Sequence, residues 1–159
     1  MDELLRILES DARTSVESIA HMTGRTEAQV RDQIAEYERE GVIKSYKTVI
    51  DWDKAGAERV LAFIDVKVVP KRDVGFDDVA ERIYRYPEVH SVWLVSGDYD
   101  LRIVVSFKSV TDVGLFVAQK LSTIDRIQGT ATHFVLRRYK EDKVLFAENA
   151  ADPRLAVSP

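Results

Sequence analysis

The sequence predicts an α+β protein of two parts, and three of its features carry that prediction. Residues 1–51 hold three short segments with apolar residues at helical spacing, followed by residues that alternate between apolar and polar. Residues 60–146 follow the order strand, helix, strand, strand, helix, strand. Residues 52–59 lack a periodic pattern and include a glycine. We expect a winged helix-turn-helix, a linker and a ferredoxin-like βαββαβ domain, with a tail over residues 147–159.

The helices of the first part are marked by apolar spacing and by capping patterns. Leucines at helical spacing predict a helix within residues 2–10. Thr14 lies three residues before Glu17, and Thr26 lies three residues before Gln29. A threonine at this distance before Glu or Gln is typical of a capping box at a helix N-terminus. The sequence therefore predicts that a second and a third helix start at these threonines.

A wing is expected after the third helix. Gly41 is placed to end that helix, because the residue after a helix often takes the left-handed conformation that suits glycine. In residues 42–46 and 47–51, β-branched and aromatic residues alternate with polar ones. This alternation is typical of two strands in a short hairpin.

Four strands and two intervening helices are expected in the second part. The strands begin near Val60, Val89, Leu101 and Ile127, and the fourth is expected to run to about Tyr139. A helix separates the first strand from the second, and another separates the third from the fourth. This order is the ferredoxin-like plan.

Both faces of the predicted sheet are partly apolar. Phe63 alternates with Ile64, and Val104 alternates with Ile103 and Val105. The helices of such a fold cover one face only, so the second face exposes apolar side chains. Large exposed apolar patches usually mark interfaces. We therefore expect this domain to form a homodimer.

Composition places the chain among soluble globular proteins. Hydrophobic residues make up 45% and charged residues 31% of the chain. No apolar run approaches the roughly 20 residues of a membrane-spanning helix. The N-terminus is acidic where a signal peptide is basic, and the chain has no cysteine. We expect a cytoplasmic protein with no membrane association.

The distribution of charge is unfavourable for binding nucleic acid. The formal net charge of the chain is −4. Residues 1–59 contain 9 Lys and Arg against 13 Asp and Glu, so the predicted DNA-binding part is itself acidic. DNA-binding proteins usually present a basic surface, which only local clusters could supply here.

The sequence contains no arrangement typical of an enzyme or of a metal site. His21, His90 and His133 are far apart, and none has the spacing of metal ligands. Asp98 and Asp100 could be mistaken for paired catalytic carboxylates, but they lie in a glycine-containing turn, where aspartate commonly binds backbone amides. We therefore expect a binding protein that has no catalytic residues, metal or cofactor.

The exposed side of the third helix is the candidate DNA-reading surface. Glutamines there can read adenine edges, and basic residues around the helix and wing can neutralise phosphates. Asp32 and Glu36 oppose this reading. From residue chemistry alone, a DNA contact and a solvated helix face are equally supported. The candidate DNA-binding residues are Arg25, Thr26, Gln29, Arg31, Gln33, Lys44 and Lys47.

Two segments resemble the leucine-responsive/asparagine regulator (Lrp/AsnC) family of bacteria and archaea. The first is residues 26–51, with the sequence EGVIKSY (40–46) at its centre. The second is the turn GDYD (97–100), between a valine-rich strand and an alternating one. The resemblance covers about residues 2–143.

This resemblance implies a transcription regulator that responds to a small molecule. It implies a homodimer that assembles into tetramers or octamers, binds double-stranded DNA, and holds an amino acid or a similar metabolite between regulatory domains. Without the resemblance, a plain hairpin turn is the better reading of residues 97–100. The chain departs from the family in having few arginines along the recognition helix. The implied effector-binding residues are Gly97, Asp98, Tyr99, Asp100, Thr130 and Thr132.

Two further functions are compatible with the sequence. Siroheme decarboxylases resemble this family in fold and act on a tetrapyrrole, which requires His90 or His133 to be positioned on the macrocycle. An absorption spectrum recorded with haem tests that function. A ligand-sensing protein with weakened DNA binding would explain the acidic recognition helix, and binding to DNA from upstream of its own gene tests it.

Overall fold

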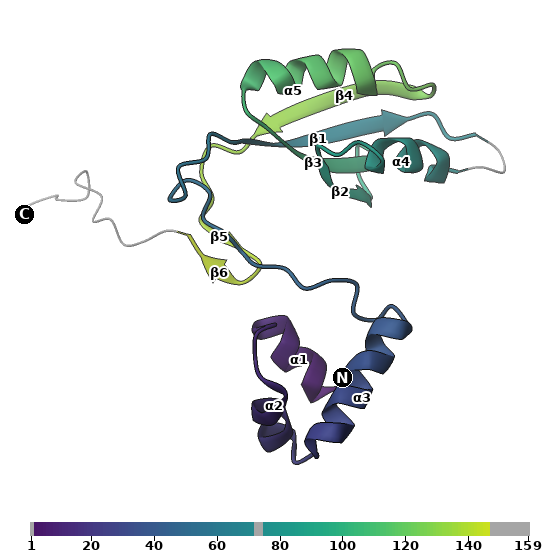
Figure 1. Ribbon diagram of the computed structural model, residues 1–159. Coiled ribbons are helices and arrows are strands. Elements are labelled where there is room, and N and C mark those ends of the chain that lie inside the picture. Colours follow the sequence, from purple (N-terminus) through teal and green to yellow (C-terminus); the bar gives the residue numbers. More distant parts are fainter. Residues whose placement is uncertain (1, 72–74, 147–159) are drawn as a thin grey trace, which may run out of the picture. The chain divides into compact units, whose positions relative to one another are not determined.

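The computed structural model describes residues 2–71 and 75–146, so the predicted tail, 147–159, lies outside the described residues. The chain divides into two compact units, residues 1–49 and residues 50–159 (Figure 1). Within the described part, no helix is long and apolar enough to cross a membrane.

The first unit consists of three helices around a small apolar core. They are α1 (Glu3–Ser10), α2 (Val16–Thr23) and α3 (Glu27–Arg39). Each helix contributes to the core because its apolar residues recur at helical spacing on one side. The buried core residues are Leu4, Ile19, Ala20 and Val30. The expected helix-turn-helix is thus confirmed.

One of the two predicted capping boxes is present. Thr26 accepts a hydrogen bond from the backbone of Gln29, and the Gln29 side chain accepts one from the backbone of Thr26. The prediction for the second helix is wrong by one residue, because Ser15 is its N-cap. Thr14 lies one residue before this cap, and its hydroxyl donates a hydrogen bond to the carbonyl oxygen of Asp11.

The predicted hairpin over residues 42–51 is wrong. Gly41 does end the α3 region with a φ of 69°, as expected. In the described chain, however, no strand lies between α3 and Val60. The two halves of the expected hairpin meet without a glycine, proline, asparagine or aspartate that would favour a tight turn. The segment stays extended, and Tyr46 donates a hydrogen bond back to Glu38 of α3 at 2.8 Å.

The second unit contains a four-stranded antiparallel sheet in the order β2-β3-β1-β4 (Figure 1). Its elements are β1 (Val60–Val68), α4 (Asp77–Tyr84), β2 (Val89–Leu94), β3 (Leu101–Phe107), α5 (Val110–Phe116), η1 (Val117–Leu121) and β4 (Ile127–Phe134). The predicted ferredoxin-like order is confirmed. η1 continues α5 as a π-helical turn.

The fourth strand is shorter than predicted. β4 ends at Phe134 and not near Tyr139, because Phe134 already lies opposite Ala62, close to the start of β1 at Val60, so a longer strand would soon have no β1 residue to pair with. The N–H of Val135 donates a last hydrogen bond to Leu61, and the chain then leaves the sheet. It continues into a small hairpin of β5 (Lys140–Glu141) and β6 (Val144–Leu145).

The main core lies between one face of the sheet and the helices. Alternate residues of β1 and β3 point to this face, as the two-residue period of a strand requires. Both α4 and α5 bury apolar residues against it. The fully buried core residues are Ala62, Ile64, Val66, Val68, Val79, Ile83, Leu101, Ile103, Val105, Val113 and Leu121.

The opposite face of the sheet is apolar only in part. Phe63 lies opposite Val104 on one side and His133 on the other. The next residue of β1 on this face, Asp65, lies opposite Arg102 of β3. The expectation of a partly apolar second face therefore holds for the end that contains Phe63, but it overlooked the charged pair beside it.

Candidate functional site

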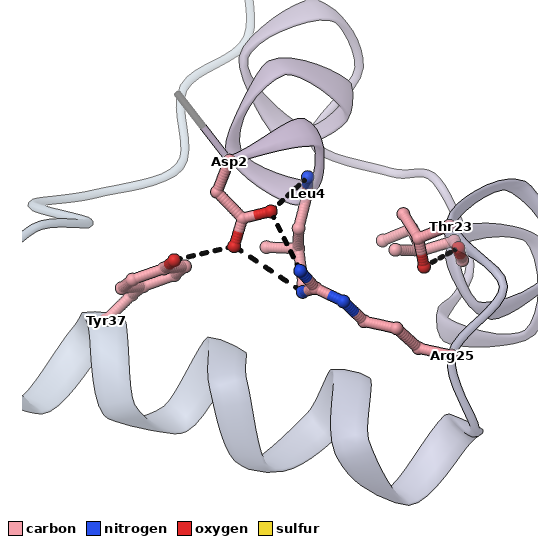
Figure 2. A network of polar contacts seen from close by, with 6 residues as sticks. Asp2, Leu4, Thr23, Arg25 and Tyr37 are labelled. Carbon is pink, nitrogen blue, oxygen red and sulfur yellow. Dashed lines mark hydrogen bonds and ion pairs between the residues drawn. The ribbon is translucent and has the colours of Figure 1, made fainter.

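The carboxylate of Asp2 joins three parts of the helix-turn-helix (Figure 2). It caps α1 by accepting a hydrogen bond from the N–H of Leu4 at 3.2 Å. The hydroxyl of Tyr37, on α3, donates to it at 2.6 Å. The guanidinium of Arg25, in the turn before α3, donates at 3.1 and 3.4 Å. We call these three side chains, Asp2, Arg25 and Tyr37, the Asp2 clamp.

The hydrogen bonds of the clamp shift the pKa values of Asp2 and Tyr37. The hydrogen bond from Tyr37 lowers the pKa of Asp2, and the bonds from Leu4 and Arg25 lower it further against the opposing effect of burial. The same bond to Asp2 raises the pKa of Tyr37. Asp2 therefore stays ionised and Tyr37 stays protonated at neutral pH, which keeps the contact intact.

Four of the seven predicted DNA-binding residues make contacts within the chain. Arg25 belongs to the clamp, and Arg31 donates a hydrogen bond to Glu27 at 2.5 Å. Thr26 and Gln29 form the capping box of α3. These contacts orient the start of the predicted recognition helix, and they reduce the positive charge that the two arginines offer to a phosphate.

The other three predicted DNA-binding residues are placed differently. Lys44 and Lys47 are exposed on the extended segment after α3. Gln33 is half-buried on α3. The arginine near the end of the helix, Arg39, is paired with Glu36 at 2.7 Å. Arg25, Arg31 and Arg39 are thus each paired with an acid. Among the basic residues between positions 25 and 47 in the described part of the chain, Lys44 and Lys47 are the two without such an ion pair.

A hollow lies where the turn between β2 and β3 approaches β1 and β4. Its volume is about 390 Å³. Its lining residues are Lys67, Asp98, Tyr99, Gln128, Gly129 and Thr130. The structure thus brings together three of the six predicted effector residues. Sequence reasoning missed the other three lining residues, Lys67, Gln128 and Gly129. They lie beside the turn only because β1 pairs with β4, with Lys67 opposite Gly129.

The remaining predicted effector residues do not line this hollow. Asp100 accepts a hydrogen bond from the N–H of Val68 at 2.8 Å and lies 3.5 Å from the Lys67 ammonium, so it holds the turn against β1. Gly97 has a φ of 141°, a conformation that favours glycine. Thr132 lies further along β4, opposite Ile64.

A buried carboxylate on the uncovered sheet face was also missed. Asp65 is 5% exposed, and Arg102 donates to its two oxygens at 2.7 and 2.9 Å. The ring of His133 lies 3.4 Å from it. The hydrogen bonds from Arg102 lower the pKa of Asp65. The available signal was a single aspartate inside the otherwise apolar run LAFIDV (61–66).

Two family models match the two units. Residues 61–145 match the model described as Lrp/AsnC ligand binding domain. Residues 3–44 match the model described as winged helix-turn-helix DNA-binding. The first match includes the sheet and the hollow, and the second includes α1, α2, α3 and the Asp2 clamp except for Asp2 itself.

Whole-length relatives agree with these matches. The chain is 50% identical to the uncharacterized HTH-type transcriptional regulator YugG of Bacillus subtilis, over 99% of this chain and 95% of that protein. The structure of a Neisseria meningitidis transcriptional regulator in complex with L-Met has a TM-score of 0.72 at 20% identity, covering 89% and 93% of the two chains. For AsnC of Escherichia coli the TM-score is 0.69 at 23% identity, with 89% and 95% covered. The chain belongs to the Lrp/AsnC family of transcriptional regulators, with a helix-turn-helix DNA-binding domain and a ligand-binding domain.

Proposed function

We propose that this regulator binds double-stranded DNA sequence-specifically, and that an amino acid or a related metabolite in the hollow beside Asp98 changes that binding. The hollow offers the carboxylate of Asp98 and the ammonium of Lys67, which stays 40% exposed although it lies 3.5 Å from Asp100. These two groups are complementary to the two charges of a free amino acid. Gly129 in its wall allows the ligand to approach the backbone closely. This arrangement is the observation that carries the proposal.

The division of labour among the turn aspartates follows from their contacts. Asp100 is occupied by the N–H of Val68 and by Lys67, so its role is to hold the turn. Asp98 is exposed and lines the hollow, so it is the carboxylate that meets the ligand's ammonium group. The L-Met complex of the Neisseria regulator, a protein of the same fold, supports an amino acid as the class of ligand.

Assembly is part of the same proposal. The uncovered sheet face, with Phe63 and Val104 beside the Asp65–Arg102 pair, is the surface through which two copies associate, and further association gives tetramers or octamers. DNA is contacted by α3 and the segment after it, with Lys44 and Lys47 neutralising phosphates and Gln33 near the base edges. The ligand acts by stabilising one assembly over another.

A thermal-shift screen against the twenty amino acids tests the ligand. A ligand that binds only the folded protein raises its melting temperature by mass action. Calorimetry then compares the wild type with Asp98→Ala and Asp98→Asn. We expect both variants to lose the binding while they keep the melting temperature of the free protein. Unchanged affinity in both variants would refute this site.

The alternative of a tetrapyrrole enzyme gains no support from the arrangement of histidines. His133 lies beside Asp65, and His90 lies beside Arg59. Neither histidine belongs to the lining of the hollow beside Asp98. The relatives that match over the whole length are named as transcriptional regulators.

A further inference from the structure

A second hollow lies at the other end of the sheet from the first. Phe107, in its wall, pairs with Val60 at the start of β1, whereas Lys67 of the first hollow lies near the end of β1. At about 3.3 Å per residue, these two ends of β1 are about 23 Å apart. The second hollow has a volume of about 300 Å³. Its walls include Glu88, Phe107, Asp112, Leu115, Phe116 and Lys120.

The carboxylate of Glu88 has one oxygen without a hydrogen-bond partner. Oε1 accepts a hydrogen bond from the Lys120 ammonium at 2.9 Å. Oε2 is buried and accepts none from the described residues. Lys120 lowers the pKa of Glu88, so the group is ionised at neutral pH. A buried charged oxygen in this state costs free energy until a donor reaches it.

Lys120 is held in a position from which it donates a hydrogen bond to only one of the two carboxylate oxygens of Glu88. Its ammonium lies over the rings of Tyr86 and Phe116, at 5.0 and 5.6 Å from their centroids. Such cation–π contacts fix the ammonium on the ring side of Glu88. Lys120 also lies in the π-helical turn η1, a rare element that often occurs at functional sites.

The remaining walls define the class of ligand. Glu88 and Asp112 carry two negative charges against the single positive charge of Lys120, so the hollow favours a cation. Phe107, Phe116 and Leu115 give it an apolar side. We propose that this hollow binds a small organic ammonium ion, which donates to Oε2 of Glu88 and packs its apolar body on these rings and Leu115. Its volume lies at the lower end of ligand pockets, which suits a compact amine.

Calorimetry on the full chain with isopentylamine hydrochloride tests this site. The buffer is phosphate, because Tris is itself an ammonium ion. Isopentyl alcohol, which has the same apolar body without the charge, is the ligand control. We expect the amine to bind and the alcohol to bind at least about tenfold more weakly, because the alcohol can donate a hydrogen bond to Glu88 but lacks the positive charge that pairs with its carboxylate. Equal affinity for both, or no binding of the amine, contradicts the proposal.

Three variants test whether the amine binds in the hollow beside Glu88. Glu88→Gln should weaken the amine about tenfold or more, because an amide cannot match the charge of the ammonium. Glu81→Gln removes an acid of α4 that is paired with Arg85 outside the hollow, and it should leave the affinity unchanged. Leu115→Arg, at a residue that is 47% exposed, places a competing cation in the hollow and should abolish binding without loss of the fold.

The site is separate from the proposed effector hollow, and the experiment keeps the two distinct. Asp98→Ala should leave the amine affinity unchanged, because Asp98 lines only the first hollow. Loss of amine binding in Asp98→Ala, or its retention in both Glu88→Gln and Leu115→Arg, overturns the assignment. Failure of the amino-acid screen leaves this test unaffected.

Discussion

Arg102 donates two hydrogen bonds to Asp65 across neighbouring strands, from Nε at 2.7 Å and from one Nη at 2.9 Å. The two residues lie directly opposite each other in the pairing of β1 with β3. Asp65 is 5% exposed although it lies on the sheet face that no helix covers. A buried carboxylate bound in this way is sensitive both to substitution and to pH.

Replacing Asp65 with asparagine should destabilise the second unit by about 1–3 kcal/mol at pH 7, because it removes the charge that Arg102 faces. The pKa of Asp65 is lowered from 3.8 in the folded chain. Its contribution is therefore present above pH 3.8 and is lost as the pH falls through the folded-state pKa. The difference in unfolding free energy between the wild type and Asp65→Asn should therefore shrink as the pH falls below 3.8.

Urea unfolding followed by tryptophan fluorescence measures this difference. Trp52 and Trp93 both belong to the second unit, so their fluorescence reports on that unit. Asp53→Asn, at a side chain that is 80% exposed, is the matched control and should have little effect. A pH-independent difference between wild type and Asp65→Asn would contradict the assigned ion pair.

The Asp2 clamp should stabilise the helix-turn-helix. Tyr37→Phe removes the 2.6 Å hydrogen bond to Asp2 and should increase amide hydrogen exchange along α3 severalfold. Tyr46→Phe removes a hydrogen bond of similar length to Glu38 at an exposed position, and its effect on α3 should be smaller. Equal exchange in the two variants would mean that the clamp does not hold α3 in place.

Much of the fold could be predicted because it depends on local patterns. The order of strands and helices follows from apolar periodicity, and the capping box at Thr26 follows from residue spacing. The same local reasoning failed for residues 42–51. Alternation there is real, but a hairpin also needs a turn and a pairing partner, and the described chain supplies neither.

The sites were less predictable because they depend on contacts between distant residues. Asp2 meets Tyr37 35 residues later, and Lys67 meets Gly129 only through the pairing of β1 with β4. No local pattern encodes such contacts. The turn at residues 97–100 was found because its glycine and aspartates are locally recognisable, although only the structure separates the roles of Asp98 and Asp100.

DNA binding should depend on the lysines of the extended segment more than on the arginines near α3. Lys44→Ala and Lys47→Ala should each lower the slope of log affinity against log salt by about 0.9, as expected for one lost phosphate contact. Arg25→Ala and Arg31→Ala should change it less, because both arginines are paired with acids. Arg82→Ala, on α4, is the control. Electrophoretic mobility shifts at several salt concentrations measure the slopes, and four equal slopes would refute this ranking.

Assembly should depend on the uncovered sheet face. Val104→Lys places a charge beside Phe63 on that face and should shift the protein toward the monomer. Val110→Lys changes an equally apolar side chain on α5 that is 56% exposed, and it should leave the assembly unchanged. Light scattering at micromolar concentration distinguishes the states. A Val104→Lys variant that assembles like the wild type would place the interface elsewhere.

The most direct test of the proposed regulation measures DNA affinity with and without the amino acid that the thermal-shift screen identifies. Fluorescence anisotropy is recorded on DNA from upstream of the gene, for the wild type and for Asp98→Ala. We expect the amino acid to change the Kd of the wild type by about 5- to 150-fold, which is the usual range of allosteric coupling. In Asp98→Ala the Kd should not respond to the amino acid. An unchanged wild-type Kd, or an equal response in Asp98→Ala, would contradict regulation through this hollow.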